Sequence, residues 1–157
     1  MKSSVYTLLI EHEKIVLAIF SNVFVSLPPE FSPYNESVNA STLEVKALWD
    51  TGATHSAISD RLAAHLELPF EDFASVSTAS GVQRVPIYPI HLALPNRLIF
   101  EELEAVEFTY SQEDGCDFII GMDVMTQGDL SITNFEEKTV FSFRIPSSSK
   151  VVFEDIA

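Results

Sequence analysis

Residues 43–53 read LEVKALWDTGA, a run in which side chains alternate up to Trp49 and then give way to Asp-Thr-Gly. Alternation with a period of two is typical of a strand that buries one face. Asp and Gly are common turn residues, so we expect the strand to end at Asp50. Because Ala47, Leu48 and Trp49 are all apolar, the sequence predicts that the turn follows a buried strand and that the Asp50 carboxylate lies inside the protein rather than in solvent.

A second junction between an apolar strand and a glycine follows farther along the chain, where residues 118–121 read FIIG. Asp123 is predicted to cap one helical turn, Val124 to Gln127, and Gly128 to end it. The same run could also supply Asp123 as a second acidic group of a site, but its place in a first helical turn favours the cap.

Between these two junctions, residues 76–85 hold a polar segment with one glycine, flanked by residues that can pair as a hairpin. Ser80 and Gly81 are predicted to form its tip. Further strands are predicted over Ile87 to Leu94 and Ile99 to Phe108. Ser59 or Asp60 is expected to cap a short helix, Arg61 to Leu66.

These elements, in this order, resemble the retropepsin-like aspartic proteases. The family signature is a catalytic Asp-Thr-Gly-Ala after an apolar strand, then a flap hairpin, then two branched apolar residues and a glycine that opens a short helix. The matching residues are Asp50, Thr51, Gly52 and Ala53, then Ser80 and Gly81, then Ile119, Ile120 and Gly121. The resemblance implies an all-β fold, a closed acid-protease (retropepsin-like) barrel with one or two short helices. The Gly121-Met122-Asp123 version is closer to the cellular and bacterial branch than to the retroviral one.

The resemblance also implies an aspartic endopeptidase. Hydrolysis by this route needs two carboxylates that share one proton across a bound water, one as general base and one as general acid. The chain holds one Asp-Thr-Gly, so the second carboxylate must come from another copy. A homodimer with Asp50 of each copy at the two-fold axis is therefore expected.

Supporting roles are carried over from the family to the neighbouring residues. Thr51 would hydrogen-bond across the dimer axis, and Gly52 would let substrate and the neighbouring loop approach closely. The flap, tipped near Gly81, would close over an extended peptide or protein substrate. Ile119 and Ile120 would pack beneath the catalytic loop, and one of them would line the cleft.

Composition narrows the possible partners. The 157 residues include 9 Lys and Arg against 23 Asp and Glu, a net charge of −14. That charge argues against nucleic acid and against an anionic membrane surface, which both attract basic proteins. No cofactor is expected, and no metal site, because the four histidines lack a ligand spacing. His55 is expected at the surface, although a place facing the cleft stays open.

Two other features, a pair of acidic residues and the cysteine between them, are not predicted to take part in chemistry. Asp114 and Asp117 are expected to be solvated. The single cysteine, Cys116, has no basic neighbour in the sequence that would activate it, so a nucleophilic role is not expected.

Chain organisation is predicted as one domain over residues 1–157 with a core of about residues 43–143. An N-terminal hairpin over 5–25 would pair Val5 to Ile10 with Ile15 to Val25, and a surface loop over 27–41 would follow. The loop holds two glycosylation sequons, at Asn35 and Asn39, that we read as accidental because no signal peptide is recognised. The same absence favours the cytoplasm. Residues 146–157 are read as a tail.

The C-terminal part departs from the retroviral pattern. Leu130 to Phe135 is predicted to form its own hairpin with Thr139 to Phe143, whereas retroviral proteases interleave their terminal strands to build the dimer sheet. A hairpin there would partly occupy the strand that enters such a sheet. Two alternatives therefore stay open: a non-hydrolysing module of the same fold that binds peptides or a protein partner, with Asp50 a buried turn aspartate, and a maturation protease of a mobile element.

Overall fold

A computed structural model describes residues 5–28 and 42–154. Its elements are β1 (Tyr6–Glu11), β2 (Ile19–Ser26), β3 (Leu43–Trp49), β4 (Ala57–Ser59), α1 (Asp60–His65), β5 (Asp72–Thr78), β6 (Gly81–Ala93), β7 (Ile99–Phe108), β8 (Phe118–Ile120), α2 (Met122–Met125), β9 (Asp129–Thr133), the 3-10 turn η2 (Phe135–Glu137) and β10 (Val140–Ile145). The prediction of an all-β fold with short helices is confirmed.

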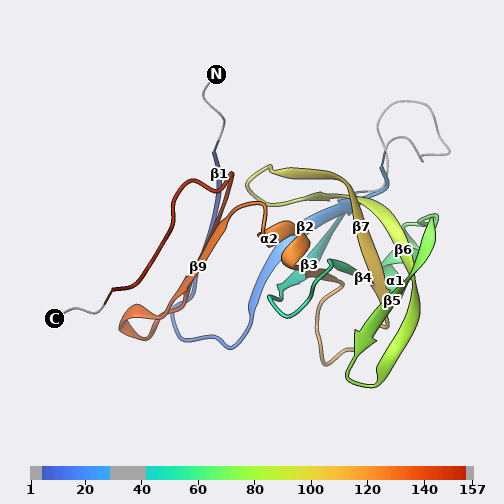
Figure 1. Ribbon diagram of the computed structural model, residues 1–157, viewed down its shortest axis with the longest axis horizontal. Helices are drawn as coiled ribbons and strands as arrows, with labels where there is room; N and C mark the ends of the chain where they lie inside the picture. Colours follow the sequence, from blue (N-terminus) through green and yellow to red (C-terminus); the bar gives the residue numbers. More distant parts are fainter. Residues whose placement is uncertain (1–4, 29–41, 155–157) are drawn as a thin grey trace.

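The larger sheet closes on itself. Its seven strands follow the order β2-β3-β8-β4-β7-β6-β5, and β2 pairs additionally with β6. Of the strands of this sheet that the structure describes, all except β5 therefore form a hydrogen-bonded ring, so none of these six is an edge strand of the barrel wall. β5 continues outside the ring as the partner of β6, and the β5–β6 hairpin projects from the barrel (Figure 1). The predicted closed barrel is confirmed.

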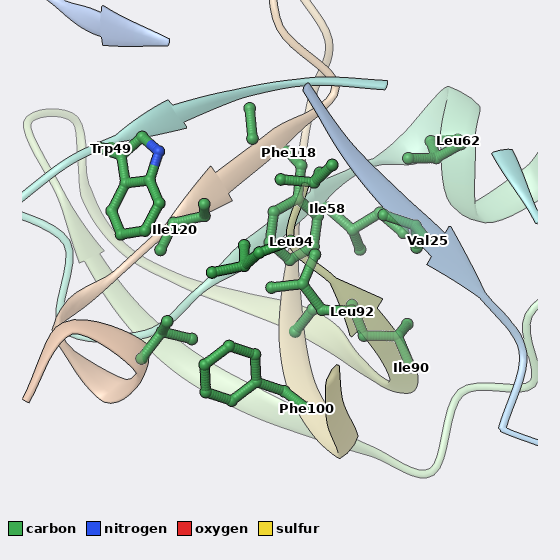
Figure 2. Packing of buried hydrophobic residues seen from close by; sticks show 14 of the residues in the cluster. Val25, Trp49, Ile58, Leu62, Ile90, Leu92, Leu94, Phe100, Phe118 and Ile120 are labelled. Atoms are coloured by element: carbon green, nitrogen blue, oxygen red, sulfur yellow. The ribbon is translucent and has the colours of Figure 1, made fainter. Parts of the chain in front are cut away.

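The barrel interior is filled by side chains that alternate inward along each strand. Phe118 and Ile120 of β8 are fully buried, while Ile119 between them is only half-buried. The same buried cluster includes Ile58 of β4, the strand that pairs with β8, and Leu92 of β6 (Figure 2). Each buried side chain of this size contributes about 1.5–3 kcal/mol relative to exposure. The packing fixes β3 and β8, the two parallel strands that lead into the candidate site.

A three-stranded sheet in the order β1-β10-β9 lies to one side of the barrel (Figure 1). Trp49 joins the two sheets, because its ring centroid lies 4.8 Å from that of Phe141 and 5.2 Å from that of Phe143. Its indole nitrogen donates to Ser21 Oγ at 2.9 Å. The residue before Asp50 is thus held from both sheets.

The predicted N-terminal hairpin is wrong. β1 and β2 both form, but β1 pairs with β10, with Leu8 opposite Phe143, and β2 pairs with β3 and β6. Alternation predicts a strand and not its partner, and Leu8 finds its buried position on the smaller sheet. The predicted C-terminal hairpin is confirmed as β9–β10.

Ser59 caps α1, where its side chain accepts from the backbone N–H of Leu62. The β5–β6 hairpin turns through Ala79 and Ser80, one residue before the tip predicted at Ser80 and Gly81, because Thr78 pairs with Gly81. Strand β6 begins at Gly81 and runs on into the strand predicted over 87–94. Residues 29–41, including both sequons, lie outside the described residues.

Candidate active site

The loop that begins at Asp50 is fastened to the end of β8 by main-chain hydrogen bonds. Asp50 N donates to the carbonyl of Ile120 at 3.0 Å, which continues the parallel β3–β8 ladder by one residue. Farther along the loop, Met122 N donates to Ala53 O at 2.9 Å and Asp123 N donates to Thr54 O at 3.2 Å. The loop therefore follows the β8–α2 junction residue by residue.

Asp50 is half-buried at the start of this loop. Its Oδ1 accepts from the backbone N–H of Gly52 at 2.8 Å. A Cβ at Gly52 would lie 3.1 Å from that oxygen, so a larger residue would crowd the carboxylate. Thr51 is exposed beside it. The carboxylate is thus oriented by its own turn.

A cavity of about 760 Å³ lies between the loop and the β5–β6 hairpin. The loop contributes Gly52, Ala53, Thr54 and His55, the barrel wall contributes Ala57, Val106, Glu107, Phe108, Thr109 and Ile119, and the hairpin contributes residues 74–78, Ser80, Gln83 and Val85. Small and apolar side chains predominate, so the backbone of a bound ligand could lie close to both walls of the cavity.

The hairpin that covers this cavity has a tight tip. Gly81 adopts φ +118°, a conformation that residues with a Cβ rarely adopt. Thr78 Oγ1 donates to Gly81 O at 2.9 Å and lies 2.9 Å from Ser80 Oγ. Of the two isoleucines expected near the cleft, Ile119 lines the cavity, whereas Ile120 is 0% exposed in the core.

Asp123 does not cap α2, contrary to the sequence prediction. The helix begins two residues earlier than expected, at Met122, and its N-cap is Gly121, which makes no side-chain hydrogen bond. The carboxylate of Asp123 instead accepts from Ser56: Oδ2 from the backbone N–H and Oδ1 from the hydroxyl, both at 2.8 Å. It also accepts from Val124 N at 2.9 Å.

Ser56 is a site residue that the sequence reasoning missed. It is 0% exposed at the end of the loop, and its hydroxyl also accepts from Gly121 N at 3.1 Å. A polar residue directly before the apolar pair Ala57-Ile58 was the only signal that could have found it.

Gly121 lies where the two segments cross. A Cβ there would lie 2.6 Å from the carbonyl carbon of His55 and 2.9 Å from Ser56 N. Both atoms belong to the backbone and cannot swing away. Only glycine fits at this crossing.

His55 is exposed and faces two cavities. Besides the cavity under the hairpin, it borders a groove of about 600 Å³ whose lining includes Glu101, Glu104 and Asp123. His55 therefore lies at the surface, as expected, and it also borders the cavity under the hairpin, which was the alternative left open.

The prediction that Asp117 is solvated is wrong. Arg61 donates to it through Nε and Nη2, each at 2.6 Å, and Ser59 Oγ donates to it at 2.8 Å. These donors, Arg61 foremost, hold the pKa of the Asp117 carboxyl below its usual value. Asp114 is exposed as expected.

Cys116 is 1% exposed, and burial raises the pKa of its thiol. A thiol kept protonated in this way is a poor nucleophile. Within residues 5–28 and 42–154, no group of three His, Cys, Asp or Glu side chains is placed to hold a metal ion. No helix in the same ranges is long and apolar enough to cross a membrane.

The chain resembles known proteins in sequence and in fold. The family model described as gag-polyprotein putative aspartyl protease matches residues 37–127, which include both strand–glycine junctions. A retropepsin-like aspartic protease from Rickettsia conorii is similar in structure, with a TM-score of 0.54, 13% identity, and coverage of 92% of this chain and 98% of that one. The retroviral protease-like domain of Ddi1 from Leishmania major aligns with a TM-score of 0.43 and 17% identity over 81% of this chain and 95% of that one. No curated protein matches the sequence.

Proposed function

The chain belongs to the gag-polyprotein putative aspartyl protease family, and on that premise we propose that it is an aspartic endopeptidase that works as a homodimer. The observation that carries the proposal is the setting of Asp50. Its carboxylate stands on a loop fastened to β8, and the residues that follow it line a cavity of about 760 Å³ under a β-hairpin.

The reaction uses Asp50 from each of two copies. One carboxylate takes a proton from a water molecule while the water oxygen attacks the carbonyl carbon of the substrate, and the protonated partner gives its proton to the carbonyl oxygen. Collapse of the tetrahedral intermediate returns a proton to the leaving amine and breaks the C–N bond. Two carboxylates that bind the same water molecule repel each other when both are ionised, so the pair keeps the one shared proton that the reaction needs.

The substrate is a peptide or protein segment in an extended conformation. The β5–β6 hairpin presents main-chain groups above the cavity, and an extended peptide can pair with such groups as an added strand. Gly52 and Ala53 on the floor, and Ser80 near the hairpin tip, bound the space that the peptide would occupy. Thr51, exposed next to Asp50, is available to a second copy.

A second candidate function is a non-hydrolysing module that binds peptides or a protein partner. It is favoured by the pairing of the terminal strands within one chain. β10 pairs with β1 on one side and with β9 on the other, so neither of its edges is open to a second copy. A dimer must then use another surface, and β1, β9 and the Asp50 loop are candidates for it.

Substitution Asp50→Asn separates the two functions. The amide keeps the volume and can still accept from Gly52 N, so the fold should persist, but it cannot act as base or acid. We expect cleavage of fluorescently labelled, denatured casein to fall by at least about 100-fold. Asp114→Asn, which removes an exposed carboxylate away from the cavity, is the matched control and should stay fully active. Cleavage by Asp50→Asn at the wild-type rate would exclude the proposed mechanism.

A further inference from the structure

We propose that Asp123 is a positioning residue for the Asp50 loop, which it holds in its working geometry through Ser56. The inference rests on the proposed function and adds a residue to it. Asp123 does not face Asp50 across the loop as a partner carboxylate; it binds the opposite end of the same loop.

The loop has two anchored ends. At the first, Asp50 N donates to Ile120 O at 3.0 Å. At the second, Ser56 donates twice to the Asp123 carboxylate, at 2.8 Å each, and Ser56 O accepts from Val106 N at 3.0 Å. The residues that line the cavity floor lie between these ends, so their position depends on both.

The hydrogen bonds at the second end require a carboxylate. Ser56 N and Val124 N can only donate, and they contact different oxygens of Asp123. The Ser56 hydroxyl accepts from Gly121 N, so its single proton is available for Asp123. Both oxygens of residue 123 must therefore accept. An asparagine would turn an NH₂ group toward one of these N–H donors.

The crossing at Gly121 couples the two segments tightly. The gap there is too small for a Cβ, and the closest atoms belong to the backbone of His55 and Ser56. A shift of Ser56 away from Asp123 cannot be absorbed by side chains at the crossing. It would displace the floor of the cavity, and a displacement of about 1 Å can cost 100-fold in rate.

The first test measures the loop without using activity. Amide hydrogen exchange is compared for wild type, Asp123→Asn and the control Glu104→Gln, which removes a negative charge lining the same groove. We expect exchange at Ser56 to become at least about tenfold faster in Asp123→Asn, with β2–β3 amides unchanged and with no change in Glu104→Gln. Unchanged exchange at Ser56 in Asp123→Asn would overturn the proposal.

The second test measures turnover of denatured casein by the same proteins. We expect kcat of Asp123→Asn to fall about 10- to 100-fold while KM stays within about twofold, because substrate still binds in the cavity but the displaced floor holds it out of position relative to Asp50. A kcat equal to that of Glu104→Gln would overturn the positioning role even if the loop exchanges faster.

A further variant covers the case in which Asp123→Asn does not fold. Ser56→Ala removes the hydroxyl but keeps the N–H bond to Asp123, so we expect a smaller change of the same kind, with faster exchange across residues 52–56 and a lower kcat. Both measurements at wild-type values in Ser56→Ala would contradict the proposal. If wild type itself fails to cleave casein, the proposed function fails, and hydrogen exchange alone then decides whether Asp123 holds the loop.

Discussion

The space around Gly121 is too small for a Cβ, and a single substitution can test this. The Gly121 φ of −96° and ψ of −173° are open to any amino acid, so the cost of an alanine there comes from the close contact of its Cβ with the backbone of His55 and Ser56. We expect Gly121→Ala to lower the free energy of unfolding by about 1–3 kcal/mol, the usual cost of overpacking. Urea denaturation checks this. Gly52→Ala is the comparison, because its Cβ meets one side-chain oxygen at 3.1 Å. Equal stability of wild type and Gly121→Ala would show that the crossing is looser than the structure has it.

Single residues were predictable from the sequence where the signal is local. Asp50 and Gly121 each stand at the end of an apolar strand, and that pattern is visible within ten residues. The partners of Asp117 and Asp123 were not predictable. Asp123 binds Ser56, 67 positions away, and Asp117 binds Ser59, 58 positions away. Nothing in the neighbouring sequence indicates either partner.

Strands and hairpins were likewise predictable from local signals, and pairings between distant strands were not. The hairpins β5–β6, β6–β7 and β9–β10 join neighbours in the chain, and turn residues predict them. The partner of β1 and the contact of β2 with β6 depend on which buried faces fit together once the barrel closes. The sequence therefore predicts that β1 is a strand but not which sheet it joins.

The junction of α1 with β8 gives an element-scale prediction. Arg61 and Ser59 hold Asp117 in its ionised form, with its pKa below the usual value. The folded state thus gains stability from ionised Asp117 at any pH above the unfolded pKa of about 3.9, and loses it as the pH falls through the lower folded pKa. Because the Arg61 side chain is 52% exposed, we expect Asp117→Asn to cost only about 1 kcal/mol at neutral pH.

Urea unfolding of wild type and Asp117→Asn at a series of pH values tests this expectation. The difference in unfolding free energy should be constant from pH 7 down to about 5 and should shrink below about 4. A difference that stays constant to the lowest pH at which both proteins fold would contradict the role of the ionised carboxylate.

At the scale of the whole molecule, the proposed chemistry requires two copies, and the molecule has features that favour and oppose their association. The net charge of −14 repels a second copy, and salt screens that repulsion. The smaller sheet carries exposed apolar side chains, Leu9 on β1 and Ile132 on β9, next to open strand edges. Such edges commonly pair with another chain. Association is therefore best measured at physiological ionic strength and above.

Mixing wild type with Asp50→Asn at constant total protein tests the shared site most directly. If each active site takes one Asp50 from each of two copies, a mixed dimer lacks half of the dyad and is inactive. After subunits have exchanged, an equal mixture should then keep about a quarter of the casein-cleaving activity of wild type, following the square of the wild-type fraction. Retention of about half, in direct proportion to the wild-type fraction, would show that one copy is sufficient and would contradict a catalytic site shared across the dimer.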